Sequence, residues 1–328
     1  MTSTRAVVFG SDPRTVDVRS FELAPLGATD VLVAAKVVGL CRSDNELLEG
    51  HLDAQLDIPD PVVPGHEWSG EVVAVGEAVT NVRPGDRVVG ECVIAPNHWF
   101  GFTYQGAASE EFVVPANLLH RMPDAMTFEQ GALVEPFTIA YNAFKVSGGS
   151  DAADVVVIVG GGMIGLCALA VAKANGSTTV VLEPSDLRRQ LATKLGADLV
   201  LDPTSLDALA EIRSATGLDG ADLVIEASGH PAGLASTVTL ARFGGRITNI
   251  GICADDSVAA PWGLVQAKDL TVRGTTGSAG IWPAALRFLG RQDIDLTPVI
   301  TARYHYEDAA AAMRATDDPA NVKVHLTF

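Results

Sequence analysis

The second half of the chain alternates apolar runs with amphipathic segments, and this alternation constrains the fold more than any other feature. From about residue 150, runs such as DVVVIVG, TTVVLEP and ADLVIEASG alternate with segments such as DLRRQLATKLGA. Continuous apolar strands separated by helices are typical of a parallel sheet that helices cover on both faces. We therefore expect an α/β fold in this half.

The first of these strands leads into VVVIVGGGMIGL, which places Gly160, Gly162 and Gly165 in G-x-G-x-x-G spacing between a strand and a helix. Gly160 permits a tight turn, Gly162 lets the backbone approach a pyrophosphate, and Gly165 lets the helix pack closely. The helix N-terminus adds N–H groups and a positive dipole end. The motif predicts a dinucleotide site that includes Met163 and Ile164. The alternative is a glycine turn that binds nothing.

Glu183 ends the next strand, eighteen residues after Gly165. A carboxylate at this place accepts hydrogen bonds from a ribose 2′-hydroxyl and repels a 2′-phosphate, which favours NAD over NADP. Arg188 and Arg189 follow closely. They weaken the inference, because a nearby arginine can hold a 2′-phosphate.

The first 145 residues contain short strand-like runs instead, such as RAVVF and SGEVVAVG, separated by turns rich in Gly, Pro and Asn. This pattern predicts an irregular, mostly antiparallel β domain. After about residue 284 come a helix, a strand, an alanine-rich helix and a final strand. Their periodicity leaves open whether they extend the second domain or return to the first.

Charge and composition exclude several classes of protein. The formal net charge of −17 argues against binding to nucleic acid or to an anionic membrane surface, because both require basic patches. The N-terminus lacks the features of a secretory signal, and the apolar residues 155–174 are divided by three consecutive glycines. The four cysteines are widely spaced and form no disulfide framework. We expect a cytoplasmic protein.

The stretch PGHEWSG places His66 beside Glu67, and the upstream stretch GLCRSD supplies Cys41 and Asp44. Thiolate, imidazole and carboxylate from one domain are chemically suitable ligands for Zn²⁺. Three protein ligands with a fourth position left open are typical of a catalytic site, whereas structural sites use four. Asp44 would orient the imidazole from behind. The alternative is a buried His–Glu pair that serves packing only.

Several segments resemble, in family order, the zinc-dependent medium-chain dehydrogenase/reductase family of alcohol and polyol dehydrogenases. They are GLCRSD, PVVPGHEWSGEVVAVGEAVTNVRPGDRVVG, LVEPFTIAYNA, VVVIVGGGMIGL, EPSDLRR, VIEASG, FGGRITNIG and KDLTVRG. The resemblance extends over nearly the whole chain. It implies a GroES-like catalytic domain, residues 1–147 and 285–328, and a Rossmann NAD-binding domain, residues 148–284.

The resemblance also implies roles for individual residues. The family's zinc ligands correspond to Cys41, His66 and Glu67, and the glutamate that holds or replaces the zinc-bound water corresponds to Glu135. The hydroxyl that hydrogen-bonds the substrate alcohol corresponds to Ser43, and the acid that braces the zinc histidine corresponds to Asp44. Cofactor contacts are implied for Arg42, Arg188, Ser228 and Gly251.

Three departures from the family pattern matter. The region that carries four cysteines around a structural zinc in many relatives has only Cys92 here, so we expect one zinc per chain. Glu46 stands where many relatives have a proton-relay histidine, which leaves the route of the proton from Ser43 to solvent open. The loop before TTVVLEP is one residue short, so matching Glu183 with the family's ribose-binding acid assumes a gap.

The expected activity is the NAD-dependent oxidation of a secondary alcohol to a ketone. Four segments, PVVPGHEWSG, VEPFTIAYNA, EPSDLRR and EASGHP, are together similar to dehydrogenases of aminoglycoside biosynthesis, such as the 2-deoxy-scyllo-inosamine dehydrogenases. This implies an amino sugar or aminocyclitol substrate, and the missing cysteines point to the C3″ hydroxyl of a gentamicin precursor. The acidic net charge suits such a cationic substrate. The aromatic lobe of His98, Trp99, Phe100 and Tyr104 either forms a pocket wall or packs as an ordinary loop.

Two alternatives remain. The first is a sorbitol- or threonine-type dehydrogenase of primary metabolism. The second is a catalytically silent relative that binds a dinucleotide for structural or regulatory reasons. The intact ligand set and the intact glycine loop argue against this second alternative. The segment DLTVRGTTGS resembles the family's dimer-edge strand, so we expect a homodimer, with a tetramer as the other option.

Overall fold

The computed structural model describes the whole chain except residues 1–2, 11–13, 254, 256 and 293. Its contacts divide the chain into unit 1, Met1–Glu135 with Ser278–Phe328, and unit 2, Pro136–Gly277. These boundaries differ from the predicted 147/148 and 284/285. The cause is helix α3 (Val134–Val146), most of which packs within unit 2. On this helix, Asn142 donates to Thr275 Oγ1 at 3.1 Å and to the Gly277 carbonyl at 3.0 Å.

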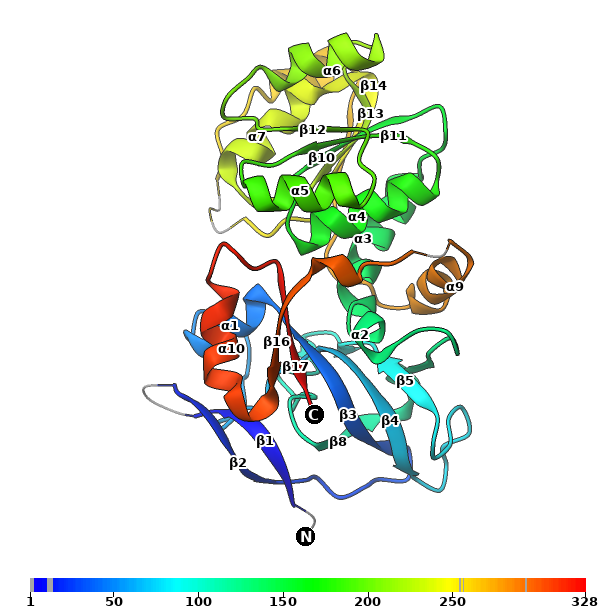
Figure 1. Ribbon diagram of the computed structural model, residues 1–328, viewed down its shortest axis with the longest axis vertical. Coiled ribbons are helices and arrows are strands. Elements are labelled where there is room, and N and C mark those ends of the chain that lie inside the picture. The colour runs from blue at the N-terminus through cyan, green and yellow to red at the C-terminus, as the bar shows by residue number, and fades with distance from the viewer. Residues whose placement is uncertain (1–2, 11–13, 254, 256, 293) are drawn as a thin grey trace. The chain divides into compact units, whose positions relative to one another are not determined.

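Unit 1 is built on a seven-stranded sheet in the order β16-β17-β3-β4-β5-β9, with β8 also paired to β3 (Figure 1). Its strands pair antiparallel, as the sequence predicts, except that β16 and β17 are parallel. The strands are β3 (Asp30–Leu40), β4 (Glu67–Val75), β5 (Arg87–Gly90), β8 (Glu111–Pro115), β9 (Leu119–Arg121), β16 (Ile300–His305) and β17 (Lys323–Thr327). The C-terminal segment therefore contributes two strands to this sheet.

Smaller elements complete unit 1. Two antiparallel pairs flank the main sheet: β1 (Ser3–Phe9) with β2 (Val16–Glu22), and β6 (Val93–Ala95) with β7 (His98–Trp99). The helices are α1 (Arg42–Leu48), α2 (Phe128–Gly131), α9 (Trp282–Gln292) and α10 (Ala309–Thr316), with short 3₁₀ turns η1 (Ala116–Leu118), η2 (Thr297–Val299) and η3 (Tyr306–Asp308). The core gathers alternate residues of the strands with Trp68 and Phe100, which are 2% and 1% exposed.

Unit 2 contains a six-stranded parallel sheet in the order β12-β11-β10-β13-β14-β15. The strands are β10 (Val155–Val159), β11 (Thr178–Leu182), β12 (Leu199–Leu201), β13 (Ala221–Glu226), β14 (Ala241–Asn249) and β15 (Thr271–Gly274). All residues of β10 and β13 are buried, which explains why β10 is continuously apolar and why β13 does not alternate between apolar and polar residues. The predicted α/β fold is confirmed.

Helices cover both faces of this sheet (Figure 1). One face carries α4 (Met163–Ala174) and α5 (Asp186–Lys194), and the other carries α6 (Ala208–Thr216) and α7 (Pro231–Leu240), followed by the short α8 (Gly263–Ala267). The apolar residues 155–174 are divided, as predicted, into β10 and α4. Among the described residues, no helix combines the length and apolarity that crossing a bilayer requires.

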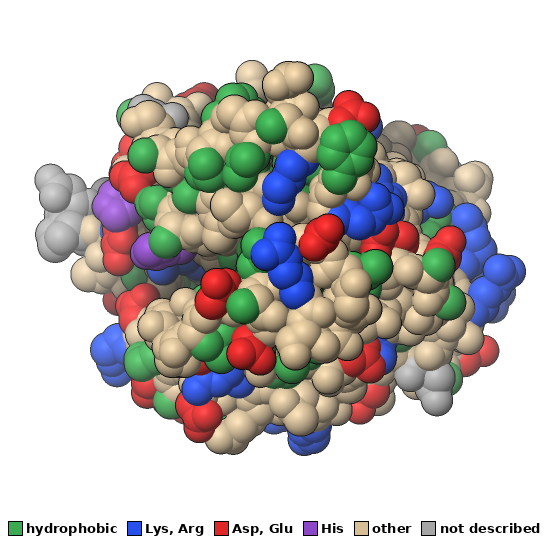
Figure 2. Space-filling model, turned by 90° about the horizontal axis from the view of Figure 1, so that it is seen from above, with side chains coloured by type: hydrophobic (Ala, Val, Ile, Leu, Met, Phe, Trp, Pro, Cys, Tyr) green, Lys and Arg blue, Asp and Glu red, His purple; other side chains and the backbone are tan. Residues whose placement is uncertain are grey.

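The surface carries charges of both signs. On the face drawn in Figure 2, acidic and basic side chains are interspersed, and neither sign covers the face alone. Large apolar side chains on the surface are few among the described residues, and Ile252, Phe243 and Trp262 are the most exposed, at 80%, 67% and 61%.

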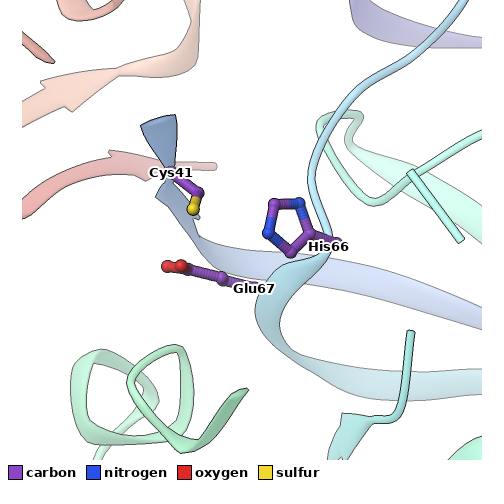
Figure 3. A group of neighbouring side chains, drawn as sticks. All are labelled: Cys41, His66 and Glu67. Carbon is purple, nitrogen blue, oxygen red and sulfur yellow. The ribbon is translucent and has the colours of Figure 1, made fainter. Parts of the chain in front are cut away.

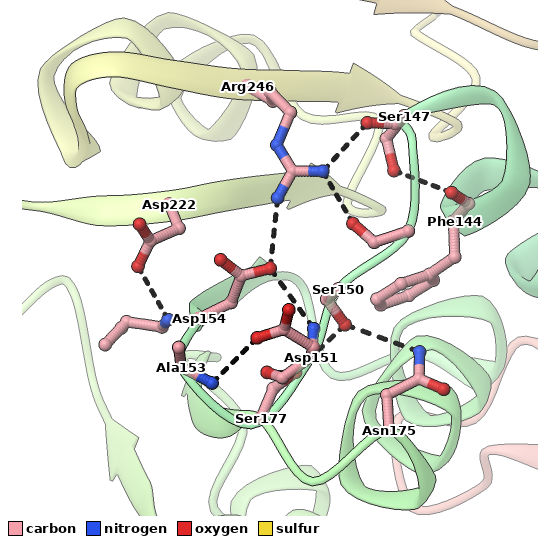
Figure 4. A network of polar contacts seen from close by, with 12 residues as sticks. Phe144, Ser147, Ser150, Asp151, Ala153, Asp154, Asn175, Ser177, Asp222 and Arg246 are labelled. Carbon is pink, nitrogen blue, oxygen red and sulfur yellow. Dashed lines mark hydrogen bonds and ion pairs between the residues drawn. The ribbon is translucent and has the colours of Figure 1, made fainter.

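One arginine fixes the loop between α3 and β10. Arg246, on β14, donates from Nη1 to the carbonyls of Ser147 at 2.9 Å and Gly149 at 2.6 Å, and its Nη2 lies 3.1 Å from Asp154 Oδ2 (Figure 4). The side chain is only 27% exposed, so these bonds are partly shielded from water. The guanidinium of Arg246 thus binds three points of the loop, while Ser177 donates to Ser150 Oγ at 2.9 Å and to the Asp151 carbonyl at 2.8 Å.

We predict that Arg246→Met lowers the free energy of unfolding by about 1–3 kcal/mol, because an ion pair and two charge-assisted hydrogen bonds are lost together. Arg273→Met on the neighbouring strand is the matched control, since Arg273 donates one bond, to the Val146 carbonyl at 3.2 Å, from an exposed position. Urea unfolding of both variants measures the difference. Equal midpoints would show that the loop does not depend on Arg246.

Candidate metal and nucleotide sites

A compact group of ligand-type side chains lies in unit 1. The ligand atoms of Cys41, His66 and Glu67 all lie within 4.8 Å of one another, and His66 and Glu67 are buried (Figure 3). Cys41 follows β3 and is the N-cap of α1, while Glu67 begins β4. Because Gly39 of β3 faces Glu67 of β4, the end of one strand meets the start of the other. The sheet register therefore assembles the group.

Two glycines explain how adjacent residues reach the same place. Gly65 has φ +101°, which L side chains rarely adopt, and His66 lies just before the regular strand begins. His66 is therefore free of the strict alternation that governs β4 itself. Gly39 leaves room for the neighbouring carboxylate, since a Cβ there would lie 2.4 Å from Glu67 Oε2.

Asp44 holds the imidazole in place. Its side chain is fully buried, its Oδ2 accepts the Cys41 N–H at 2.8 Å, and its Oδ1 lies 3.5 Å from His66 Nδ1. Burial alone would lower the pKa of His66, but Asp44 and Cys41 raise it well above its usual value. His66 Nδ1 and Asp44 Oδ1 are buried without a full hydrogen bond. A cation on the other side of the ring would compensate this concentration of negative groups, so the residues suit a zinc ion.

Glu67 has a partner that sequence reasoning missed. Lys323, on β17, donates from Nζ to Glu67 Oε1 at 2.9 Å, to Glu67 Oε2 at 2.6 Å and to the Leu40 carbonyl at 3.0 Å. Burial would lower the pKa of Lys323, but Glu67 raises it. The side chains are 3% and 1% exposed. Both oxygens of the predicted ligand Glu67 thus already accept hydrogen bonds. The one signal in the sequence was a single lysine in the apolar strand NVKVHL.

Glu135, at the start of α3, is buried but does not belong to the compact group. The Cys92 thiol lies 3.9 Å from its Oε1. Burial raises the pKa of Glu135 to about 7, with Glu67 adding to the effect and His66 opposing it. Burial likewise raises the pKa of Cys92 to about 12, so this cysteine stays a thiol.

The other predicted catalytic residues follow Cys41 on α1. Ser43 is half-buried, Arg42 is exposed, and Arg42 Nε lies 3.7 Å from Glu46 Oε1 across one helical turn. In the aromatic lobe, Phe100 is buried in the core, whereas Tyr104 is 47% exposed. The ring that meets the ligand group is Phe102, whose centroid lies 4.8 Å from that of His66. Sequence reasoning did not single out Phe102.

The glycine loop lies in unit 2, between β10 and α4. Gly160 has φ +100°, and a Cβ on Gly165 would lie 1.8 Å from the Gly160 carbonyl oxygen, so neither tolerates a side chain. Gly162 is the N-cap of α4, and nothing lies within 4 Å of where its Cβ would be. Met163 and Ile164 open the helix. The loop thus presents open backbone at a helix N-terminus, which suits a pyrophosphate.

Glu183 borders this loop and is 4% exposed. Its Oε2 accepts the Gly161 N–H at 2.7 Å and its Oε1 accepts the Ser185 N–H at 2.8 Å. Arg189 turns away to the carbonyls of Glu183 and Pro184, while Arg188 is half-buried with its Nε unpartnered. The carboxylate is therefore held beside the glycines, as its predicted role requires.

Ser228 and Gly251 both lie next to Glu226, a residue that sequence reasoning overlooked. Glu226 ends β13, is fully buried and accepts hydrogen bonds from the Ser228 N–H at 2.9 Å, the Ser228 hydroxyl and the Gly229 N–H at 3.2 Å. A Cβ on Gly251 would lie 2.3 Å from the Gly229 nitrogen. This packing fixes the backbone at the carboxyl ends of β13 and β14.

Comparison with known proteins matches two sequence families: "Alcohol dehydrogenase GroES-like domain" over residues 27–124 and "Zinc-binding dehydrogenase" over residues 163–291. L-threonine 3-dehydrogenase from Pyrococcus horikoshii is 33% identical over 312 residues, 88% of this chain and 89% of that protein. Sorbitol dehydrogenase from Gallus gallus is 30% identical over 321 residues, 92% and 90% of the two chains.

Solved structures agree over the full length. A zinc-binding dehydrogenase from Sinorhizobium meliloti 1021 bound to NADP superposes with a TM-score of 0.90 at 26% identity and covers 100% of both chains. An alcohol dehydrogenase from E. coli CFT073 in complex with NADH gives a TM-score of 0.89 at 27% identity and covers 99% of both. The predicted combination of a GroES-like domain and a Rossmann domain is confirmed.

We predict that Lys323→Met lowers the free energy of unfolding of the metal-free protein by about 3–5 kcal/mol, because the Glu67 carboxylate stays buried without its partner. The double variant Glu67→Gln/Lys323→Met should recover most of that loss. Lys173→Met is the matched control and should cost at most about 1 kcal/mol, since its pair with Asp198 is partly exposed. A double-mutant cycle by urea unfolding measures the coupling. A coupling near zero would contradict a buried ion pair.

Proposed function

The chain belongs to the zinc-binding alcohol dehydrogenase family, and we propose that it oxidises a secondary alcohol to a ketone while reducing NAD. The observation that carries the proposal is the buried group of Cys41, His66 and Glu67, whose ligand atoms lie within 4.8 Å. An open glycine loop bordered by a carboxylate supports the choice of cofactor. Both features are intact, which favours an enzyme over a catalytically silent relative.

Bound by these three side chains, Zn²⁺ would supply a Lewis acid that lowers the pKa of the substrate alcohol, and bound NAD would accept the hydride. The overall reaction converts the alcohol and NAD⁺ into the ketone, NADH and one proton. We propose that Ser43 Oγ accepts that proton from the substrate hydroxyl and at the same time gives up its own hydroxyl proton, so that the serine stays neutral. Glu46 lies one turn further along α1 with its side chain 30% exposed, and we propose that it passes the proton to water.

The residues around the metal position it and exclude water. Asp44 fixes the ring of His66 through its Oδ1 at 3.5 Å, so that the other ring nitrogen serves as the ligand. Phe102 covers that ring at 4.8 Å and removes water from one side of the site. Glu135 is the second carboxylate near the metal in our proposal. Its pKa of about 7 would let it hold a proton at neutral pH.

The named substrates of the relatives share one chemical feature, which we propose for this chain. L-threonine and sorbitol each carry the secondary hydroxyl beside a carbon that bears a second nitrogen or oxygen. We propose a substrate of this kind, and rank polyols and hydroxy amino acids first because of these names. An amino sugar has the same arrangement. It is supported by the net charge of −17, which attracts cations.

We also propose a homodimer. Strand β15 is the edge of the parallel sheet in unit 2, and residues 271–274 are largely exposed. An edge strand presents unpaired backbone groups to a second copy. The same strand from a partner would satisfy them.

We predict that sorbitol, L-threonine or a gentamicin-type aminoglycoside reduces NAD with a higher kcat/KM than 2-propanol, which lacks the neighbouring heteroatom. Absorbance of NADH measures the rates, and elemental analysis should find about one zinc per chain. Cys41→Ser should lose zinc and activity together, whereas Cys253→Ser, in unit 2, should keep both. Turnover by metal-free enzyme would contradict the mechanism, and 2-propanol as the best substrate would contradict the substrate class.

We predict that kcat/KM is higher with NAD than with NADP, and that Glu183→Gln reduces this preference by about tenfold or more, since the charge that repels the 2′-phosphate is removed. Arg188→Gln is the control in the same pocket and should lower activity with NADP only. Equal kcat/KM values for the two cofactors in the parent enzyme would show that an arginine, and not Glu183, dominates the ribose site.

A further inference from the structure

A groove of about 480 Å³ lies in unit 1 between α9 and the chain around β9. Its apolar part includes Met122, Pro123 and Leu286, and its charged part includes Arg121, Arg287 and Arg291. Its volume is within the range of pockets that bind small molecules. None of its lining residues belongs to the metal group or to the glycine loop. The groove therefore shares no residue with the proposed metal site or the proposed nucleotide site.

The groove is positively charged, whereas the protein as a whole has a net negative charge. The chain has 40 acidic and 23 basic side chains, and Arg121 is paired with Asp86. Arg287 and Arg291 are both exposed, and neither forms an ion pair or hydrogen bond with any residue that the structure describes. Within the described part of this strongly acidic protein, two positive charges thus remain without partners.

The two arginines occupy one face of α9. They are four residues apart, which places their Cβ atoms about 5–6 Å from each other, and their like charges slightly destabilise the helix. Arg291, in the last turn, gains from the helix dipole, but Arg287 lies mid-helix and does not. Helix stability therefore does not account for Arg287. A shared anionic ligand would account for both arginines, because residues four apart lie on the same face of a helix.

The wall opposite these arginines is held rigidly. His120 Nε2 lies 2.8 Å from Glu91 Oε1, and its ring stacks on Trp282 at the start of α9, with centroids 5.7 Å apart. Glu91 Oε2 also accepts the Gly280 N–H at 3.0 Å, just before the helix. These contacts fix α9 against β9. The groove is preformed, which lowers the cost of binding a ligand.

We propose that this groove binds an organic phosphate. The phosphate lies between Arg287 and Arg291, and the organic part lies over Met122 and Leu286. Guanidinium groups recognise phosphate oxygens through paired, charge-assisted hydrogen bonds, and a phosphate monoester carries about two negative charges at neutral pH. A dianion matches the two unpartnered arginines better than a carboxylate does. The proposal does not depend on the substrate of the proposed reaction.

The test uses the zinc-loaded enzyme saturated with NAD, so that the glycine loop is already filled. Isothermal titration with glucose 6-phosphate should detect binding that depends on Arg287 and Arg291, while glucose and gluconate, which share its hydroxyl groups but lack the phosphate, should bind more weakly. Arg287→Gln/Arg291→Gln should weaken glucose 6-phosphate binding by about tenfold or more, the effect of one lost charge-assisted contact. Raising the salt from 50 to 300 mM should weaken binding in the parent.

Arg314→Gln, which removes an exposed arginine from the unrelated helix α10, is the matched control and should bind like the parent. Circular dichroism and NADH formation should be unchanged in the double variant, which excludes misfolding. The proposal is overturned if the parent does not bind glucose 6-phosphate, or if the double variant binds it equally well. A change of oligomeric state in the double variant without phosphate binding in the parent would assign the groove to a protein contact instead.

Discussion

The pairing of β3 with β4 and β17 is the constraint on which the metal group depends. Gly39 faces Glu67 on one side and His325 on the other, so the end of β3, the start of β4 and the start of β17 meet in one place. A shift of one residue in either pairing would turn Glu67 or Lys323 to the opposite face of the sheet. The sheet register therefore determines whether the ligand group and its buried counter-charge come together at all.

Much of the fold was predictable because it follows from local patterns. The central strands β10 and β13 of unit 2 are buried throughout, so they lack the alternation of a half-exposed strand, and Gly160 and Gly165 mark a turn whose close contacts exclude side chains. The ligand types at Cys41, His66 and Glu67 were also visible, since thiol, imidazole and carboxylate stand out in apolar surroundings. Periodicity did not determine where the last strands are placed, because their placement depends on contacts between distant segments.

The features that sequence reasoning missed share a physical cause. Lys323 and Glu67 are 256 residues apart, and no spacing rule connects a lysine in one strand with a glutamate in another at that distance. Phe102 follows the short β6–β7 pair and contacts His66 across 36 positions of the sequence, a contact that no local pattern reveals. The contacts divide the chain after Glu135, whereas the prediction placed the first boundary at 147/148, because α3 is one continuous helix and composition does not reveal where a helix passes from one unit to the next.

The discontinuity of unit 1 has a consequence for synthesis. Residues 37–40 of β3 pair with β17, yet all of Pro136–Gly277 must be translated before β17 exists. At ordinary elongation rates this takes roughly ten to thirty seconds, during which the nascent N-terminal segment has an open strand edge and a Glu67 carboxylate without its lysine. Such an edge is a template for pairing with other chains. We expect the newborn polypeptide to need shielding by the ribosome or a chaperone in that interval, and unit 2 to become folded first.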